Sequence, residues 1–98
     1  MLTDLKNLNL AFNNLAPLSP QIGQLTNLHT LYLTGNKIQS FPSEIGLLTN
    51  LRVLGIANNS FQSLPVEMNQ LTNLKILHIN WKDKELVPKN IKYAINIV

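Results

Sequence analysis

A repeat of 23 residues runs through the whole chain. The segment QLTNL occurs at residues 24–28 and again at 70–74, and LLTNL stands between them at residues 47–51. The repeats are counted from a leucine that recurs at Leu5, Leu28, Leu51 and Leu74. Ile97 falls on the next multiple of 23, so the same count predicts that a fifth repeat begins there. Self-similarity at this period is typical of solenoids, in which each unit buries its apolar face against its neighbours.

The spacing of apolar residues within a repeat predicts one short strand and one helical turn. Period-two spacing at the fourth and sixth positions indicates a strand with one face inward. These positions hold Leu8 and Leu10, Leu31 and Leu33, Leu54 and Ile56, and Leu77 and Ile79. Apolar residues three apart later in the repeat, such as Ile45 and Leu48, suit a single helical turn. A proline precedes that turn in three repeats, and we expect it at the first helical position, where the missing amide hydrogen has no helical partner.

The ninth position holds Asn13, Asn36 and Asn59, and these residues are predicted to form a structural ladder. An asparagine side chain can donate and accept at once, so it can satisfy backbone groups left without sheet partners between neighbouring coils. In the fourth repeat this position is Lys82, and Lys84 replaces the apolar residue at the eleventh position. Because a buried lysine is costly, we expect Lys84 to extend to solvent, or a bulge to let Leu86 fill its place. The break is interpreted as a degenerate final coil or as a binding loop around Trp81.

The pattern L-x-x-L-x-L-x-x-N-x-L-x-x-L-P-x-x-I-G-x-L-T-N resembles the leucine-rich repeat. The arm FPSEIGLL at residues 41–48 is similar to the 23-residue class of Ras-suppressor and Scribble-like scaffolds and of many bacterial repeat proteins. The resemblance implies an α/β solenoid, a right-handed horseshoe segment with parallel strands on the concave face and short helical or 3₁₀ turns on the convex face. Residues 1–98 would form a single domain, with repeats at residues 5–27, 28–50, 51–73 and 74–96 and partial repeats at both ends.

Composition narrows the function further. Hydrophobic residues make up 45% of the chain and charged residues 13%, which is too apolar for a disordered tail. No apolar run approaches the roughly 18 residues of a membrane span. The chain has no cysteine, so thiol nucleophiles, thiolate metal sites and disulfides are excluded. The start, MLTDLKNLNL, does not resemble a secretory signal, and this favours a cytoplasmic location.

The sequence predicts neither catalysis nor a cofactor. His29 and His78 stand in different columns, two repeats apart, and are poorly placed to share a metal ion. No serine, histidine and acid form a relay, and no glycine-rich phosphate loop is present. A basic column at the second position, made of Lys6, His29, Arg52 and Lys75, is interpreted as a solvated rim, with steering of an acidic partner or a phosphate backbone as the alternative. Nucleic-acid binding is not expected, because aromatic residues are not interleaved with these charges.

The concave face is the remaining candidate for binding, because its outward columns differ from repeat to repeat while the inward columns do not. The proposed partner-binding residues are Tyr32, Val53, Ile76, His78 and Trp81. Aromatic residues with a polar group contribute most at interfaces, so the sequence predicts a non-catalytic module that binds a protein. The alternatives are the recognition segment of a multidomain enzyme, such as a GTPase or ubiquitin ligase with its catalytic part outside this chain, and recognition of a lipid or glycan surface. Neither end carries a polar cap, which predicts a piece of a longer repeat protein or self-association through the ends.

Overall fold

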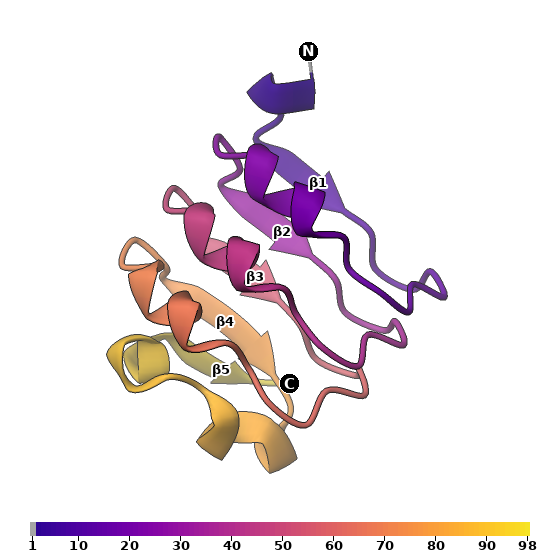
Figure 1. The fold of residues 1–98 in the computed structure, drawn as a ribbon. Coiled ribbons are helices and arrows are strands. Elements are labelled where there is room, and N and C mark those ends of the chain that lie inside the picture. The colour runs from indigo at the N-terminus through magenta and orange to yellow at the C-terminus, as the bar shows by residue number, and fades with distance from the viewer. Residues whose placement is uncertain (1) are drawn as a thin grey trace.

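The computed structural model describes residues 2–98. These residues form a stack of coils, with the short strands on one side of the stack and the 3₁₀ helices on the other (Figure 1). The strands are β1 (Asn7–Asn9), β2 (Thr30–Tyr32), β3 (Val53–Gly55), β4 (Ile76–Ile79) and β5 (Ile95–Ile97). The 3₁₀ helices are η1 (Leu2–Asp4), η2 (Pro20–Gln24), η3 (Ser43–Leu47), η4 (Val66–Gln70), η5 (Trp81–Leu86) and η6 (Lys89–Ala94). The strands form one parallel sheet in chain order, and the helices cover the opposite side. The predicted α/β solenoid is confirmed.

The core lies between the sheet and the helices. Leu31, Leu54 and Leu77 pair along the sheet and are fully buried, whereas Leu8 in the first coil is only half-buried. This gradient follows from the stacking itself, because an inner coil is covered on both sides and the first coil on one. In the described part of the chain, no helix is long and apolar enough to cross a membrane.

The last coil is shorter than the others, so the prediction that Ile97 opens a fifth repeat is wrong. Strands β1 to β4 pair at intervals of 23 residues, but Leu77 pairs with Ile95, and Ile97 lies beside Ile79 at the sixth position. After η2, η3 and η4 a Thr-Asn-Leu turn joins the 3₁₀ helix to the next strand. That turn is missing after η6, which runs directly into β5.

The prolines lie one residue earlier than predicted. Pro42, Pro65 and Pro88 are the N-cap residues of η3, η4 and η6, with extended backbone, and only Pro20 is at the first helical position. In that first arm Ser19 is the N-cap, and its side-chain oxygen accepts a hydrogen bond from the backbone N–H of Gln21 at 3.1 Å. The ring restricts φ to the same range at either position, so the proline still fixes where the helix starts.

Asn36 shows how the ninth-position column connects neighbouring coils. Its Oδ1 accepts from the backbone N–H groups of Asn13 and Leu15, each at 3.0 Å. Its Nδ2 donates to the carbonyl oxygens of Leu10 at 2.9 Å and Leu33 at 3.0 Å. Asn59 repeats this arrangement one coil later, with its Oδ1 accepting from the N–H of Ile38 and its Nδ2 donating to three carbonyls.

A second asparagine column, which the sequence reasoning did not single out, lies on the other side of the strands. The Nδ2 groups of Asn27, Asn50 and Asn73 donate to the carbonyl oxygens of Thr3, Thr26 and Thr49 at 2.7 to 2.9 Å. The recurring Thr-Asn dipeptide is its sequence signal. In the shortened last coil the hydroxyl of Tyr93 donates to the carbonyl oxygen of Leu74 at 2.5 Å. The carbonyl oxygen of Thr72 lies 3.4 Å from the same hydroxyl. Tyr93 therefore bonds the same edge of the coil that an asparagine bonds elsewhere.

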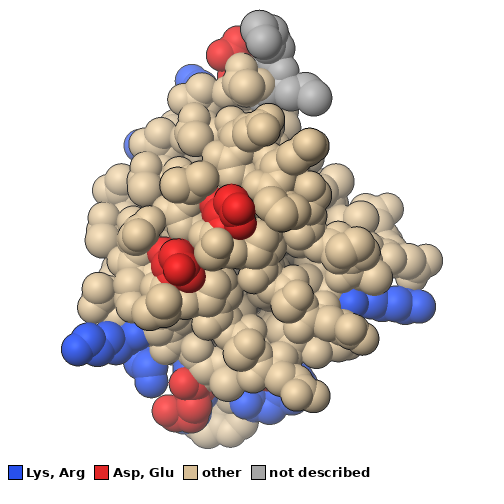
Figure 2. Space-filling model, viewed as in Figure 1, with Lys and Arg blue, Asp and Glu red and all other residues tan. Residues whose placement is uncertain are grey.

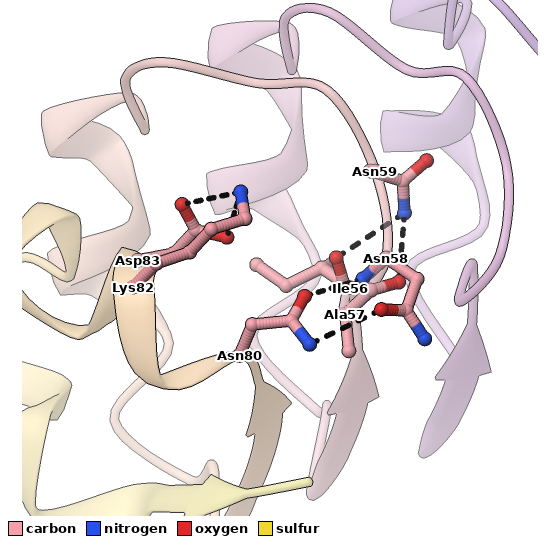
Figure 3. A network of polar contacts seen from close by, with 7 residues as sticks. All are labelled: Ile56, Ala57, Asn58, Asn59, Asn80, Lys82 and Asp83. Atoms are coloured by element: carbon pink, nitrogen blue, oxygen red, sulfur yellow. Dashed lines mark hydrogen bonds and ion pairs between the residues drawn. The ribbon is translucent and has the colours of Figure 1, made fainter.

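The fourth coil replaces the asparagine turn with helix η5 (Figure 3). Lys82 is exposed and its Nζ lies 3.3 Å from the carboxylate of Asp83, which is buried. Lys84 is about one third exposed, and its Nζ lies 3.6 Å from the centre of the Trp81 ring. Leu86 packs against the core and Val87 is buried in it. The structure thus combines an outward Lys84 with inward Leu86, and a helical turn rather than a bulge provides both.

Candidate binding surface

The concave face is formed by the outward residues of five adjacent strands. The pairing of β1 to β4 places Asn7, Thr30, Val53 and Ile76 in one row and Asn9, Tyr32, Gly55 and His78 in the next. Val53 and Ile76 are direct neighbours, and 36% of the Ile76 surface is exposed. Equivalent positions on neighbouring strands lie about 4.8 Å apart, so one partner side chain can contact two coils.

Tyr32 and His78 lie two strands apart yet contact each other across β3. Their rings stack with centroids 6.1 Å apart and an interplanar angle of 24°. Gly55 lies between them, and a Cβ there would come within 2.8 Å of both the Tyr32 ring and the Thr34 hydroxyl. The absence of a side chain at Gly55 therefore lets the tyrosine ring lean across the sheet. Sequence analysis selected both aromatic residues but not the glycine that brings them together.

His78 carries an unsatisfied polar atom in this stack. Its Nδ1 is buried and has no hydrogen-bond partner among the described residues. A buried polar atom without a partner costs about 1 to 3 kcal/mol, and an apolar ring of similar size would avoid that cost. Stability alone therefore does not explain a histidine at this position.

A shallow hollow of about 380 Å³ lies beside the stack. Its lining consists of Asn9, Ala11, Phe12, Tyr32, Thr34, Asn58, His78 and Val98. Asn58 is held to the next coil by a reciprocal amide pair, in which Asn80 Oδ1 accepts from the Asn58 N–H at 2.6 Å and Asn80 Nδ2 donates to Asn58 Oδ1 at 3.1 Å (Figure 3). This pair fixes one wall of the hollow across two coils.

Phe12 forms another wall of the hollow and is the main residue that sequence reasoning missed. Its side chain is 77% exposed, and its φ of 58° lies in the left-handed region, which is strained for a bulky residue. Gly35 and Asn58 occupy the same column with φ of 75° and 57°, and these residue types adopt that conformation readily. The sequence signal for this residue was a phenylalanine at a repeat position that is glycine and asparagine in the next two coils. The ring lies against Gly35, where a Cβ would overlap it.

Trp81 belongs to the same column but does not line the hollow. It is 66% exposed at the start of η5, with Lys84 over one face of its ring. The five residues selected from the sequence therefore fall into three places: the stack of Tyr32 and His78, the apolar pair of Val53 and Ile76, and Trp81 at the edge of the face.

Charge is distributed unevenly around this surface. At the second repeat position Lys6, Arg52 and Lys75 are exposed and His29 is half-buried, along the edge where the strands begin. Arg52 and Lys75, with Asn50 and Asn73, line a polar hollow of about 360 Å³. On the helical face shown in Figure 2, acidic groups lie near the middle, at the upper tip and at the lower edge, and basic groups lie around the periphery. Glu44 in η3 and Glu67 in η4 belong to that helical side.

Comparison with known proteins places the chain in a family. The sequence profile of the leucine-rich repeat region matches residues 1–90, and the chain belongs to this family. A solved structure of a leucine-rich repeat protein from Leptospira interrogans is similar, with a TM-score of 0.85 and 38% identity over 96% of this chain. The match covers 26% of that protein, so this chain spans about a quarter of its length. A search of curated proteins finds no match. Leucine-rich repeats typically serve as non-enzymatic modules for protein interaction.

Proposed function

We propose that this chain is a non-catalytic protein-interaction module that binds its partner on the concave face of the sheet. The observation that carries the proposal is the set of aromatic and apolar side chains on that face that the core does not use. Phe12 and Trp81 are largely exposed, and Tyr32 stacks on His78 beside an open hollow. Exposed aromatic residues around a hollow are the arrangement in which a few side chains provide most of the binding energy.

The size of the face supports contact with only part of a partner. A standard protein interface uses roughly 20 to 30 residues on each side, which is more than the outward side chains of five short strands provide. The similar Leptospira protein is about four times as long. The proposal therefore includes that these coils are a segment of a longer repeat protein and supply part of a longer concave interface.

The experiment is capture of partners from a lysate by the complete parent protein. The test variant carries Tyr32→Ala, His78→Ala and Trp81→Ala, and the matched control carries Glu44→Ala, Gln62→Ala and Glu67→Ala away from the sheet. Circular dichroism checks that both variants fold. We expect the concave variant to lose specific partners that the wild type and the control retain. Equal recovery by both folded variants would refute the concave-face proposal.

A further inference from the structure

The charges around the concave face are not balanced within the protein. Arg52 and Lys75 lie on adjacent coils, where the N–H of Lys75 donates to the carbonyl oxygen of Arg52 at 2.7 Å. Like charges at adjacent positions of a sheet repel each other. Within residues 2–98, neither side chain forms an ion pair with a carboxylate. The fold therefore holds two cations side by side without a partner of its own.

Every acidic residue of the chain lies away from the outward rows of the sheet. Asp4 is in η1, and Glu44 and Glu67 are in the helices of the opposite side. Asp83 is buried and paired with Lys82, while Glu85 lies 4.0 Å from Lys84 and 3.6 Å from Lys92. The sheet rows themselves carry neutral side chains. A negatively charged partner thus meets cations at the rim and no acidic side chain on the face.

The order of side chains on two neighbouring coils defines which ligand can bind there. In each of these two coils a cation directly precedes the strand (Arg52 or Lys75), an aliphatic residue starts the strand (Val53 or Ile76), and the row of the Tyr32 and His78 stack follows. The rim and the aromatic row are three residues apart, about 10 Å along a strand. An extended segment of about three residues covers the same length.

We propose that the partner is an acidic polypeptide segment with a neutral aromatic anchor. Its carboxylates lie against Arg52 and Lys75, and its anchor side chain enters the hollow between Phe12, Tyr32 and His78. This inference rests on the proposed function, because it assigns a chemical class to the partner of the same face. A phosphate backbone would meet the same rim, but single-strand binding sites interleave cations with stacking aromatic residues, and here the cations and the aromatic stack lie in separate rows.

The test uses fluorescence anisotropy with the 98-residue chain and labelled nine-residue peptides. The probe peptide carries three glutamates on one side of a central tyrosine, with serine and glycine elsewhere, and both chain directions are made. Matched peptides replace the glutamates with glutamines or lysines, or the tyrosine with alanine. A single-stranded DNA oligonucleotide is the competing ligand class. We expect the acidic tyrosine peptide to bind at least tenfold more tightly than each matched peptide and more tightly than the oligonucleotide.

Two double variants with the same net charge test whether the rim cations Arg52 and Lys75 bind the peptide. The double variant Arg52→Glu and Lys75→Glu reverses the rim, and Lys37→Glu with Lys89→Glu makes an equal change elsewhere. We expect at least a tenfold loss of affinity for the first and less than a threefold change for the second, with binding that weakens as salt rises. Tighter binding of the lysine peptide or the oligonucleotide, equal effects of the two double variants, or no binding of any acidic peptide would overturn the inference.

The two proposals can fail separately. If partner capture by the parent protein is lost with Tyr32→Ala but is unchanged by salt and by the rim reversal, the concave face binds a partner and the acidic class is wrong. If the triple variant with Tyr32→Ala, His78→Ala and Trp81→Ala has no effect on capture, the proposed function itself is wrong.

Discussion

Replacing Asn36 with alanine should remove a large share of the stability of this chain. The substitution deletes four hydrogen bonds at 2.9 to 3.0 Å and leaves two backbone N–H groups and two carbonyl oxygens without that partner. A neutral hydrogen bond contributes about 1 kcal/mol net, and a buried group left unpaired costs about 1 to 3 kcal/mol. Three of the four contacts are only partly buried, so water can replace part of the loss. We therefore expect the free energy of unfolding to fall by about 2 to 3 kcal/mol, out of roughly 5 to 15 for a domain of this size.

Urea denaturation followed by far-ultraviolet circular dichroism measures this change. The control is Asn14→Ala, because Asn14 is an exposed asparagine in the equivalent turn of the preceding coil and makes no side-chain hydrogen bond within the described residues. Asn59→Ala should lose at least as much as Asn36→Ala, because its contacts are fully buried. The melting temperature of the Asn36 variant should fall by about 10 to 20 °C. A loss within 0.5 kcal/mol of the Asn14 control would refute the reasoning that the side chain, rather than the coil packing, satisfies these backbone groups.

Three further predictions use the same denaturation assay. Gly35→Ala should lower the free energy of unfolding by about 2 kcal/mol, because a side chain at φ 75° is strained and its Cβ overlaps the Phe12 ring. Adding Phe12→Ala should restore part of that loss. Phe12→Ala alone should not destabilise the protein. His78→Phe should raise stability by about 1 kcal/mol, because it removes the unpaired Nδ1, while it weakens partner binding; a clear loss of stability would contradict this. Tyr93→Phe should cost about 1 kcal/mol by removing the hydroxyl that bonds the Leu74 carbonyl, and an unchanged midpoint would contradict it.

The regular part of the fold could be predicted because each inward column repeats the same requirement. Leucine at the fourth position, from Leu8 to Leu77, fixes both the strand face and the spacing between coils. The last coil could not be predicted by counting, because the period predicts where a residue falls only while each coil keeps its length. The missing Thr-Asn-Leu turn after Ala94 was visible in the sequence, but its consequence for β5 required knowing that this turn only joins helix to strand.

The candidate site was less predictable for a physical reason. A concave side chain is recognised from sequence by its position in a repeat, which places Tyr32 and His78 in one row. Contact between them depends on the empty volume at Gly55, which is a property of three strands together. The role of Phe12 depends on backbone conformation, since its position is equivalent to Gly35 and Asn58, and only their shared positive φ shows that the backbone of a phenylalanine is strained there.

The eighth column carries an exposed aromatic ring in the first and the fourth coil. In the first three coils the backbone at this column is left-handed, which suits Gly35 and Asn58 but strains Phe12. In the fourth coil Trp81 starts the helix η5 instead, and Val87 returns the chain to the core beyond it. Two different backbone solutions therefore present an exposed aromatic ring at the same column, one at a conformational cost and one by a change of secondary structure. Glycine or asparagine would suit the left-handed backbone at residue 12 better than phenylalanine, so folding does not require the Phe12 ring. We propose that binding on the concave face is the reason for both exposed rings.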